Sequence, residues 1–411
     1  MTKTTPRGWR ARRRQGRKNR VLIIIENCPY PQDHRVWKEA QGLLRAGFDV
    51  SVIAPSWPDQ RARETVDGVD VNRYRPVPER PGALGFILEF GTAWIQIFAL
   101  TLRIFVRDGF AAIQSCNPPD IFFSVAVWYK LAGCPYIFDQ HDLSPELYSA
   151  RFGRDNDIIV RILRVLERLT FRTADCVVAV NEPQRVITEA RSKPRRFVTV
   201  RNGPIPAPIS PRPVVPDPRN GRRYLGVWVG AMGSVDDGLD IAIQAIAALV
   251  HDVGRTDCQF VFIGSGEVFD EVVALTRTLK VEEWVTFTGW VDHEYVFDYI
   301  ATADIGLQPD PKNPRTDLAT AVKTMEYMSA GVPVVAFDLD ETRQTVGDAG
   351  LYAEGNDPSS FAVMIDKLLS DADQRAAMSD AGRRAIRESL SWTHQEERYI
   401  AMYRELLGAT P

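Results

Sequence analysis

Strand-length runs of apolar residues alternate with helical patterns along almost the whole chain. The first run, Arg20 to Glu26, is rich in β-branched residues and predicts a buried strand. Asp33 to Ala46 follows as a helix with one apolar face, and Phe48 to Ala54 returns to a strand. Further strands are expected at Ala111 to Ser115, Tyr136 to Asp139, Cys176 to Val180 and Phe197 to Val200. This alternation predicts a parallel sheet that is covered by helices on both faces.

A proline-rich segment interrupts the pattern. Pro204 to Pro218 contains seven prolines and therefore cannot form a helix or a central strand. The alternation then restarts, with strands expected at Tyr224 to Val229, Gln259 to Ile263, Val285 to Phe287, Ile305 to Gln308 and Val334 to Phe337. We therefore predict an α/β protein with two doubly wound, Rossmann-like domains joined by a stiff linker.

The predicted boundaries follow from these patterns. They are a basic tail at 1–19, a first domain at 20–203, the linker at 204–222, a second domain at 223–391 and a C-terminal helical segment at 392–411. Whether that last segment packs back on the first domain stays open at this stage. Ligands of open parallel sheets bind at the carboxyl ends of the strands, and two such sheets facing each other across a hinge can hold two substrates. By analogy, this architecture favours a group-transfer enzyme.

The charge of the chain is small overall but unevenly placed. The 411 residues carry a net charge of −3, which argues against a polyanion-binding molecule. Residues 1–20, however, hold nine Lys or Arg and no acidic residue. Such a tail is typical of disordered segments that favour anionic surfaces, either phospholipid headgroups or nucleic acid. Residues 21–411 offer no basic stripe with interleaved aromatics, so we expect no nucleic-acid partner.

The cysteines and the start of the chain bear on the compartment. There are five cysteines, an odd number, and none lies in a CxxC pair. We therefore expect neither a disulfide framework nor a metal site, and a reducing compartment fits best. The apolar run after the basic tail is too short for a secretory signal. These features predict a cytoplasmic protein. A peripheral location on the cytoplasmic membrane face is compatible with that prediction.

One apolar segment stands apart from the strand–helix pattern. Leu84 to Val106 contains only two charged residues, Glu89 and Arg103, and is almost long enough to span a bilayer. It fits a helix buried against a sheet. It also fits a helix that lies in a membrane interface, since Trp94, several Phe and the flanking Arg107 suit that location. A true membrane span is the least favoured interpretation, because Glu89 and the flanking strand–helix pattern argue against it.

The stretch TAVKTMEYMSAGVPVVAFD, from Thr320 to Asp338, places a lysine in the first turn of a helix, where the helix dipole disfavours a cation. Thr320 is the expected N-cap of a helix from Ala321 to Ala330, and Gly331 suits its left-handed exit. The free amides of Ala321, Val322 and Lys323 would then form an anion site, which Lys323 would reinforce.

Glu326 follows one turn later on the same helix face, where its carboxylate could accept hydrogen bonds from vicinal hydroxyls such as those of a ribose. The alternative is a surface ion pair between Lys323 and Glu326, worth about a few tenths of a kcal/mol.

Several stretches together resemble the retaining GT-B glycosyltransferases of the family-4 type. The donor-binding helix of that family is similar to VKTMEYMSAGVPVVAFDLDETRQTVGDAGLY, within a subgroup that carries Lys-x-x-Glu-Tyr-Met. Its Gly-rich loop resembles VWVGAMGSVDDGLDIAIQAI, and its nucleotide-contacting half resembles FIGSGE with VTFTGWVDHEYVFDYIATADIGLQP. In the first domain, YPQDHRVWKEAQGLLRAGFDVSVIAP and FDQHDLSPELY resemble a subgroup with the pattern Asp-x-Arg-Val and an internal His-Asp. The resemblance covers roughly residues 20–410.

The resemblance implies roles for particular residues. It makes His141, near the transferred sugar, and Glu326, on the ribose hydroxyls, the catalytic candidates. It implies donor binding by Gly230, Gly233, Gly289, Trp290, Val291, Ala321, Val322, Lys323 and Glu326, and an acceptor side that includes Asp33, Arg35 and Asp142.

Four of these residues also have simpler interpretations. His141 could only order the turn after its strand, and Asp33 could only cap the next helix. Arg35 could be a solvated helix residue. The ring of Trp290 could serve packing, with the base held through the backbone of the turn instead.

The sequence departs from the family pattern at the diphosphate clamp. Leu318 stands where many members have a second glutamate, and Ala231 and Asp237 fall near the places of an Arg and a Lys. Lys323 and Arg315 are the residues that could compensate.

The resemblance implies transfer of a sugar from a nucleotide sugar, UDP- or GDP-linked, with retention of configuration and without a metal or other cofactor. We expect a glycan or lipid-linked acceptor and a possible anionic membrane contact through residues 1–20 and 84–106. The alternatives are a sugar-nucleotide epimerase of the same architecture, an inactive homologue, and a nucleic-acid-binding protein that acts through its tail.

Overall fold

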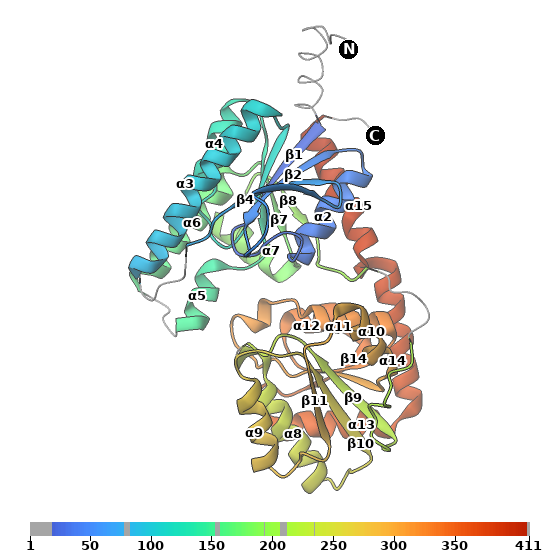
Figure 1. Cartoon of the computed structure of the whole chain (residues 1–411). Coiled ribbons are helices and arrows are strands. Elements are labelled where there is room, and N and C mark those ends of the chain that lie inside the picture. The colour runs from blue at the N-terminus through green and yellow to red at the C-terminus, as the bar shows by residue number, and fades with distance from the viewer. Residues whose placement is uncertain are drawn as a thin grey trace. The chain divides into compact units, whose positions relative to one another are not determined.

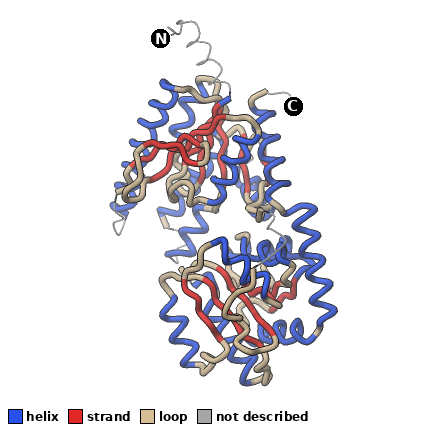
Figure 2. Tube along the Cα trace, turned by 45° about the vertical axis from the view of Figure 1, so that its right-hand side comes forward, coloured by secondary structure: helices blue, strands red, loops and turns tan. Residues whose placement is uncertain are grey.

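The computed structural model describes residues 19–77, 83–152, 157–192, 194–205, 212–233 and 235–408. The chain forms two compact units. The first runs to Val200 and takes up the chain again at Glu396, and the second comprises Arg201–Gln395. Each unit is a sheet with helices on both sides (Figures 1 and 2). Nearly all of the basic tail predicted at 1–19, and residues 206–211 of the predicted linker, lie outside the described residues.

The first unit contains an eight-stranded sheet in the order β3-β4-β2-β1-β5-β6-β7-β8. All strand pairs are parallel except β3 with β4. The strands are β1 (Arg20–Ile24), β2 (Asp49–Pro55), β3 (Arg63–Val66), β4 (Val69–Tyr74), β5 (Ala112–Cys116), β6 (Tyr136–Gln140), β7 (Cys176–Ala179) and β8 (Phe197–Thr199). The hairpin β3–β4 is absent from our prediction, although its turn residues Asp67 and Gly68 both adopt positive φ (49° and 84°), as a type I′ hairpin turn requires.

The helices of the first unit cover the two faces of this sheet. They are α2 (His34–Arg45), α3 (Ala83–Arg107), α4 (Phe123–Leu131), α5 (Ser144–Phe152), α6 (Ile158–Thr173), α7 (Glu182–Ser192) and the part of α15 (Trp392–Leu406) from Glu396 onward. Helices α3, α4 and α6 pack on the face that includes Ile113 and Phe138. Helix α15 contacts the opposite face, because its tyrosines bond to Gln114, the neighbour of Ile113 on β5.

The second unit contains a six-stranded, fully parallel sheet in the order β11-β10-β9-β12-β13-β14. Its strands are β9 (Tyr224–Val229), β10 (Cys258–Ile263), β11 (Val285–Gly289), β12 (Ile305–Gln308), β13 (Val334–Phe337) and β14 (Gly350–Ala353). Its helices are α8 (Leu239–His251), α9 (Phe269–Thr278), α10 (His293–Thr302), α11 (Val322–Ala330), α12 (Asp340–Val346), α13 (Pro358–Ser370) and α14 (Ala372–Ala385). The predicted fold class, two parallel α/β sheets, is confirmed.

The long apolar segment forms α3, and only one of its faces is buried. Ala93, Ile97 and Ile104 belong to the core of the first unit. The window Leu88–Arg107 is long and apolar enough to cross a membrane by length and composition, with a mean hydropathy of 1.3, yet only 22% of it is buried. The helix packs on β2 and β4 of the sheet, so the interpretation as a buried helix holds for one face alone.

Candidate active site

In the second unit, hydrogen bonds join the loops that follow three neighbouring strands. The Gly230 amide after β9 donates to Ile263 O (3.1 Å), and the Gly264 amide after β10 donates to Gly289 O (3.0 Å). Gly264 has φ +138°, and a Cβ there would lie 1.9 Å from Gly230 O, so only glycine fits. These loops bring the predicted Gly230 and Gly289 to one end of the sheet, the carboxyl end of its strands.

Helix α11 begins without a side-chain cap, which corrects one expectation. Ala321, with φ −75° and ψ 95°, occupies the N-cap position, and its side chain makes no cap hydrogen bond. Thr320, the predicted cap, instead donates to Glu341 Oε1 at 2.8 Å. That buried carboxylate also accepts from Arg201 (2.5 Å), so it holds the threonine away from the helix. The predicted exit at Gly331 is confirmed by its φ of +76°.

The lysine in the first turn of α11 has a specific partner in a distant loop. Lys323 Nζ lies 3.3 Å from Asp310 Oδ1, in the loop after β12, and 4.6 Å from the centroid of the Trp228 ring. Its side chain is only 13% exposed and pairs with a carboxylate outside α11, so Lys323 is not a solvated surface residue. The carboxylate and the ring hold this cation at the positive end of a helix despite the dipole.

Tyr327 fixes α11 to the sheet. Its hydroxyl accepts from the Val229 amide (3.1 Å) at the end of β9 and donates to Leu307 O (3.3 Å) on β12. Both the tyrosine and its helix neighbour Met328 are buried, whereas Glu326 is half-buried. The first turn of α11 and the Gly-rich loop after β9 are therefore held at the same end of the sheet.

In the first unit, His141 follows the carboxyl end of β6. Its ring Nε2 lies 2.7 Å from Asp139 Oδ2, and its amide donates to Asn117 Oδ1 (2.7 Å). The Asn117 side-chain amide also donates to Asp142 O (2.7 Å), so this asparagine shapes the turn that carries both residues. The sequence analysis missed Asn117, although a polar residue directly after the β5 strand is a usable signal.

Arg35 is buried behind His141 rather than solvated. Its guanidinium donates to both oxygens of Asp139 (2.8 and 3.1 Å) and to Val200 O (2.9 Å), and only 5% of the side chain is exposed. The alternative of a solvated helix residue is therefore wrong. Asp33 does cap α2, because its side chain accepts from the Val36 amide (3.0 Å), and its acceptor-side role stays a prediction.

Comparison with known families identifies the protein family of this chain. Residues 33–203 match the family described as "Glycosyl transferase 4-like domain" and residues 223–371 match "Glycosyl transferases group 1". Together the two matches cover most of the chain, in the order that a two-domain enzyme requires.

The chain belongs to the group 1, or family-4, glycosyltransferases.

Relatives are similar to this chain in sequence, and solved structures share its fold. An uncharacterized glycosyltransferase of Methanocaldococcus jannaschii is 22% identical over 90% of this chain and 93% of its own. A GDP-mannose-dependent monoacylated alpha-(1-6)-phosphatidylinositol monomannoside mannosyltransferase of Corynebacterium glutamicum is 30% identical over 39% of this chain and 42% of its own. A sucrose-phosphate synthase of Thermosynechococcus elongatus superposes with a TM-score of 0.75 at 18% identity, covering 95% of this chain and 100% of that one. The fold is GT-B.

Two residues of the region where this glycosyltransferase departs from its family pattern have specific partners. Arg315, which could compensate for the lost clamp, pairs with Asp236 (2.7 Å) in the segment after the Gly-rich loop. Asp237, which stands near the place of a basic residue, accepts from the Gly233 amide (3.0 Å). Acidic side chains therefore occupy this loop, and Lys323 lies in the first turn of α11.

Trp290 differs from the expectation of a packing residue. Its side chain is 80% exposed, in the turn that follows β11. Gly289 before it adopts φ +69°, and Val291 after it packs on the core. The ring is therefore exposed at the strand ends of the second unit, and its role there stays a prediction.

A buried polar chain behind His141 connects β6 to α15. Glu39 Oε1 lies 3.3 Å from Arg35 Nε, and Glu39 Oε2 accepts from Gln114 (2.8 Å). Gln114 Oε1 in turn accepts from the hydroxyls of Tyr399 (2.7 Å) and Tyr403 (2.6 Å) on α15. The sequence analysis missed these residues; two tyrosines at i and i+4 on the last helix were the available signal.

The charged groups around His141 set its protonation state. Burial alone would lower the pKa of His141, but the Asp139 carboxylate outweighs it and raises the pKa to about 9. Burial likewise opposes ionisation of Asp139, yet Arg35 and His141 hold the pKa of that carboxyl well below its usual range. Burial, with Asp139 nearby, raises the pKa of Glu39 to about 8. At neutral pH the site therefore presents an imidazolium.

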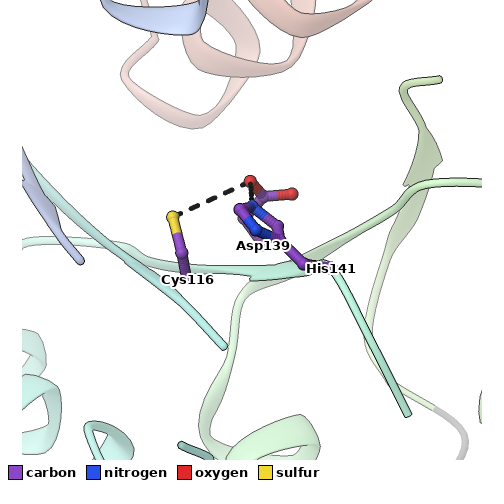
Figure 3. Close-up of side chains that lie close together, drawn as sticks. All are labelled: Cys116, Asp139 and His141. Carbon is purple, nitrogen blue, oxygen red and sulfur yellow. Dashed lines mark hydrogen bonds and ion pairs between the residues drawn. The ribbon is translucent and has the colours of Figure 1, made fainter. Parts of the chain in front are cut away.

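Cys116, Asp139 and His141 could in principle form a metal site. Their ligand atoms lie within 4.8 Å of one another, and Figure 3 shows the thiol and the ring on the same carboxylate. The Arg35 guanidinium, however, occupies both oxygens of Asp139 and would repel a cation. Burial also raises the pKa of the Cys116 thiol well above its usual value. This donor set does not fit a metal ion.

Proposed function

We propose that this glycosyltransferase moves a sugar from a UDP- or GDP-sugar to a hydroxyl of a glycan or lipid-linked acceptor, with retention of anomeric configuration. The second unit would bind the donor and the first unit the acceptor. The observation that carries the proposal is the first turn of α11, which has no side-chain cap and has a lysine held beside it.

The donor side of the proposal rests on helix and loop geometry. The first-turn amides at Ala321, Val322 and Lys323 suit a diphosphate, because they combine free donors with the positive end of the helix dipole. Gly230 and Gly233 would let the backbone approach the diphosphate, and Glu326 would accept hydrogen bonds from the ribose. The backbone of Gly289, Trp290 and Val291 would hold the base.

His141 is proposed to act on the first unit's side of the reaction. As an imidazolium it would stabilise negative charge that develops while the glycosidic bond breaks, by the same electrostatic reasoning as an oxyanion hole. Asp139 and Arg35 would position its ring, and Asp33 and Asp142 would lie on the acceptor side. The leaving phosphate would itself take the proton of the acceptor hydroxyl, so that the new bond forms on the face the nucleotide leaves.

A metal-independent reaction fits the chemistry of these residues. The helix amides and Lys323 would neutralise the diphosphate, which is the task of a divalent cation in other transferases. The acidic side chains Asp236, Asp237 and Asp310 already have partners, which are Arg315, Gly233 N and Lys323 respectively.

An acceptor at a membrane surface is supported by two features. Residues 1–20 are strongly basic, and the segment 84–106 exposes apolar side chains on α3. The Corynebacterium relative is described as acting on a phosphatidylinositol mannoside, which is a lipid. We propose a cytoplasmic enzyme that is peripheral to an anionic membrane.

Product analysis tests the function. The purified protein is incubated with each nucleotide sugar and a panel of glycan and lipid-linked acceptors, with and without a chelator. Proton NMR then reads the configuration of the new anomeric centre. We expect release of the nucleoside diphosphate, a product with the donor's anomeric configuration, and the same rate with chelator. Inversion, conversion of the donor sugar without an acceptor, or loss of activity with chelator would each contradict the proposal.

A further inference from the structure

Three neighbouring helices of the first unit present apolar side chains to solvent. Among the described residues, nineteen large hydrophobic side chains are exposed, and eleven of them belong to α3, α4 and α6. They are Leu88, Ile95, Leu102 and Val106 on α3, Val127, Trp128 and Leu131 on α4, and Ile158, Ile162, Val165 and Leu169 on α6. We name this surface the α3–α4–α6 face.

These helices lie side by side on one side of the sheet (Figure 1). The rings of Phe105 on α3 and Tyr129 on α4 are 5.2 Å apart, and Lys130 at the end of α4 donates to Thr173 O at the end of α6. The eleven side chains therefore belong to one continuous layer of helices rather than to scattered sites.

The solvent-exposed side of α3 is apolar, whereas a helix that faces water is expected to be polar on that side. Between Leu88 and Arg107 the exposed positions are Leu88, Gly91, Ile95, Ala99, Leu102, Arg103 and Val106. Only Arg103 is polar. A surface helix normally carries polar residues on this side, because its apolar stripe faces the core. The core contact of α3 is already provided by Ala93, Ile97 and Ile104, so the outward apolar stripe does not serve the fold.

Helix α6 adds a row of positive charge to the same face. Its exposed arginines, Arg161, Arg164, Arg168 and Arg172, run beside its exposed aliphatic residues at helical spacing. None of these four arginines forms an ion pair within the described residues. The acid of this helix, Glu167, is buried and pairs with Arg191 (3.4 Å). The outward side of α6 is therefore half aliphatic and half cationic.

We propose that the α3–α4–α6 face docks on the surface of an anionic phospholipid bilayer. The aliphatic side chains and Trp128 enter the boundary between headgroups and acyl chains, as in helices that lie in a membrane interface. The four arginines of α6 bind lipid phosphates, each contributing electrostatic attraction to the anionic surface. A second copy of the chain fits less well, because a twofold interface would bring two arginine rows together without acidic partners.

Membrane docking rests on the proposed function only in its purpose, which is to bring the enzyme to an acceptor at a membrane. Docking itself needs no sugar transfer. A failure of vesicle binding and a failure of catalysis are therefore separate results, since nucleotide binding and product formation are measured in solution.

Vesicle co-sedimentation of the full chain tests the proposal. The vesicles are phosphatidylcholine alone or phosphatidylcholine with phosphatidylglycerol. One variant reverses two arginines of α6, Arg164→Glu with Arg168→Glu. The matched control reverses Arg398→Glu with Arg404→Glu, which are exposed on α15, the helix on the other face of the same sheet. An apolar variant, Ile95→Asn with Leu102→Asn, tests α3.

The wild type should bind the anionic vesicles more strongly than the neutral ones, and less strongly at high salt. Each arginine is worth about fivefold in membrane partition, so the α6 variant should bind at least about 25-fold more weakly. The apolar variant should also lose binding, while the α15 control binds like the wild type. Equal loss in the control, or wild-type binding by both face variants, would overturn the proposal. So would a wild-type dimer that the face variants dissociate.

Discussion

Replacing Asp139 by asparagine should lower the pKa of His141 sharply. The Asp139 carboxylate lies 2.7 Å from the His141 ring and outweighs the effect of burial, so that the pKa of His141 reaches about 9 against an ordinary value of 6.5. A rise of this size corresponds to about 3 kcal/mol of preference for the charged form. Without the charge, burial dominates, and we expect the pKa of His141 in Asp139→Asn to fall to about 6.5 or below.

The sign of the stability effect follows from the raised pKa. The His141–Asp139 interaction stabilises the folded first unit fully below about pH 6.5, and this contribution is lost as the pH rises through about 9. If the imidazolium serves sugar transfer, activity of the wild type should fall above about pH 9. The variant should lose activity from about pH 6.5 upward.

NMR titration of the His141 ring protons measures this pKa directly. The His141→Gln variant assigns the signal by its disappearance, and Asp142→Asn serves as the matched control. That control removes a carboxylate from the adjacent position while leaving the Asp139 contact intact. A wild-type pKa at or below 6.5, or the same pKa in Asp139→Asn as in the wild type, would refute the reasoning.

Two further predictions concern stability. Tyr399→Phe or Tyr403→Phe alone leaves Gln114 Oε1 with one bond and should cost about 0.5–1.5 kcal/mol, whereas the double variant leaves it unpaired and should exceed the sum. Urea unfolding of the two singles and the double measures this, and additive values would contradict it. Gly264→Ala should lower the melting temperature and weaken nucleotide binding, because its Cβ meets Gly230 O. Unchanged melting by calorimetry would contradict that.

The sequence predicted both sheets because buried parallel strands are short apolar runs that alternate with helices. It missed β3, β4 and β14. Arg63–Val66 in β3 is a partly exposed edge strand without an apolar run. The turn at Asp67 and Gly68 was the stronger signal, and it was overlooked. The exit of α11 at Gly331 was predictable because it depends on one residue's backbone freedom.

The sequence predicted the partners of the site residues less completely than it predicted the strands, for a physical reason. Periodicity places a residue on its own helix but says nothing of partners that are distant in sequence. Arg35 bonds to Asp139, 104 positions later, and Lys323 pairs with Asp310, which belongs to another strand end. Thr320 has the right type and position for an N-cap, yet a buried carboxylate from α12 competes for its hydroxyl. These outcomes depend on tertiary contacts that no local pattern encodes.

Calorimetric binding of nucleoside diphosphates and nucleotide sugars tests the donor site at α11 most directly. The variants are Lys323→Met and Glu326→Gln, with Glu283→Gln, an exposed glutamate elsewhere in the same unit, as the control. We predict selective binding of one nucleotide by the wild type and the control, and binding about ten- to hundredfold weaker in both α11 variants. No binding by any nucleotide, or equal binding by all four proteins, would contradict a donor site at this helix.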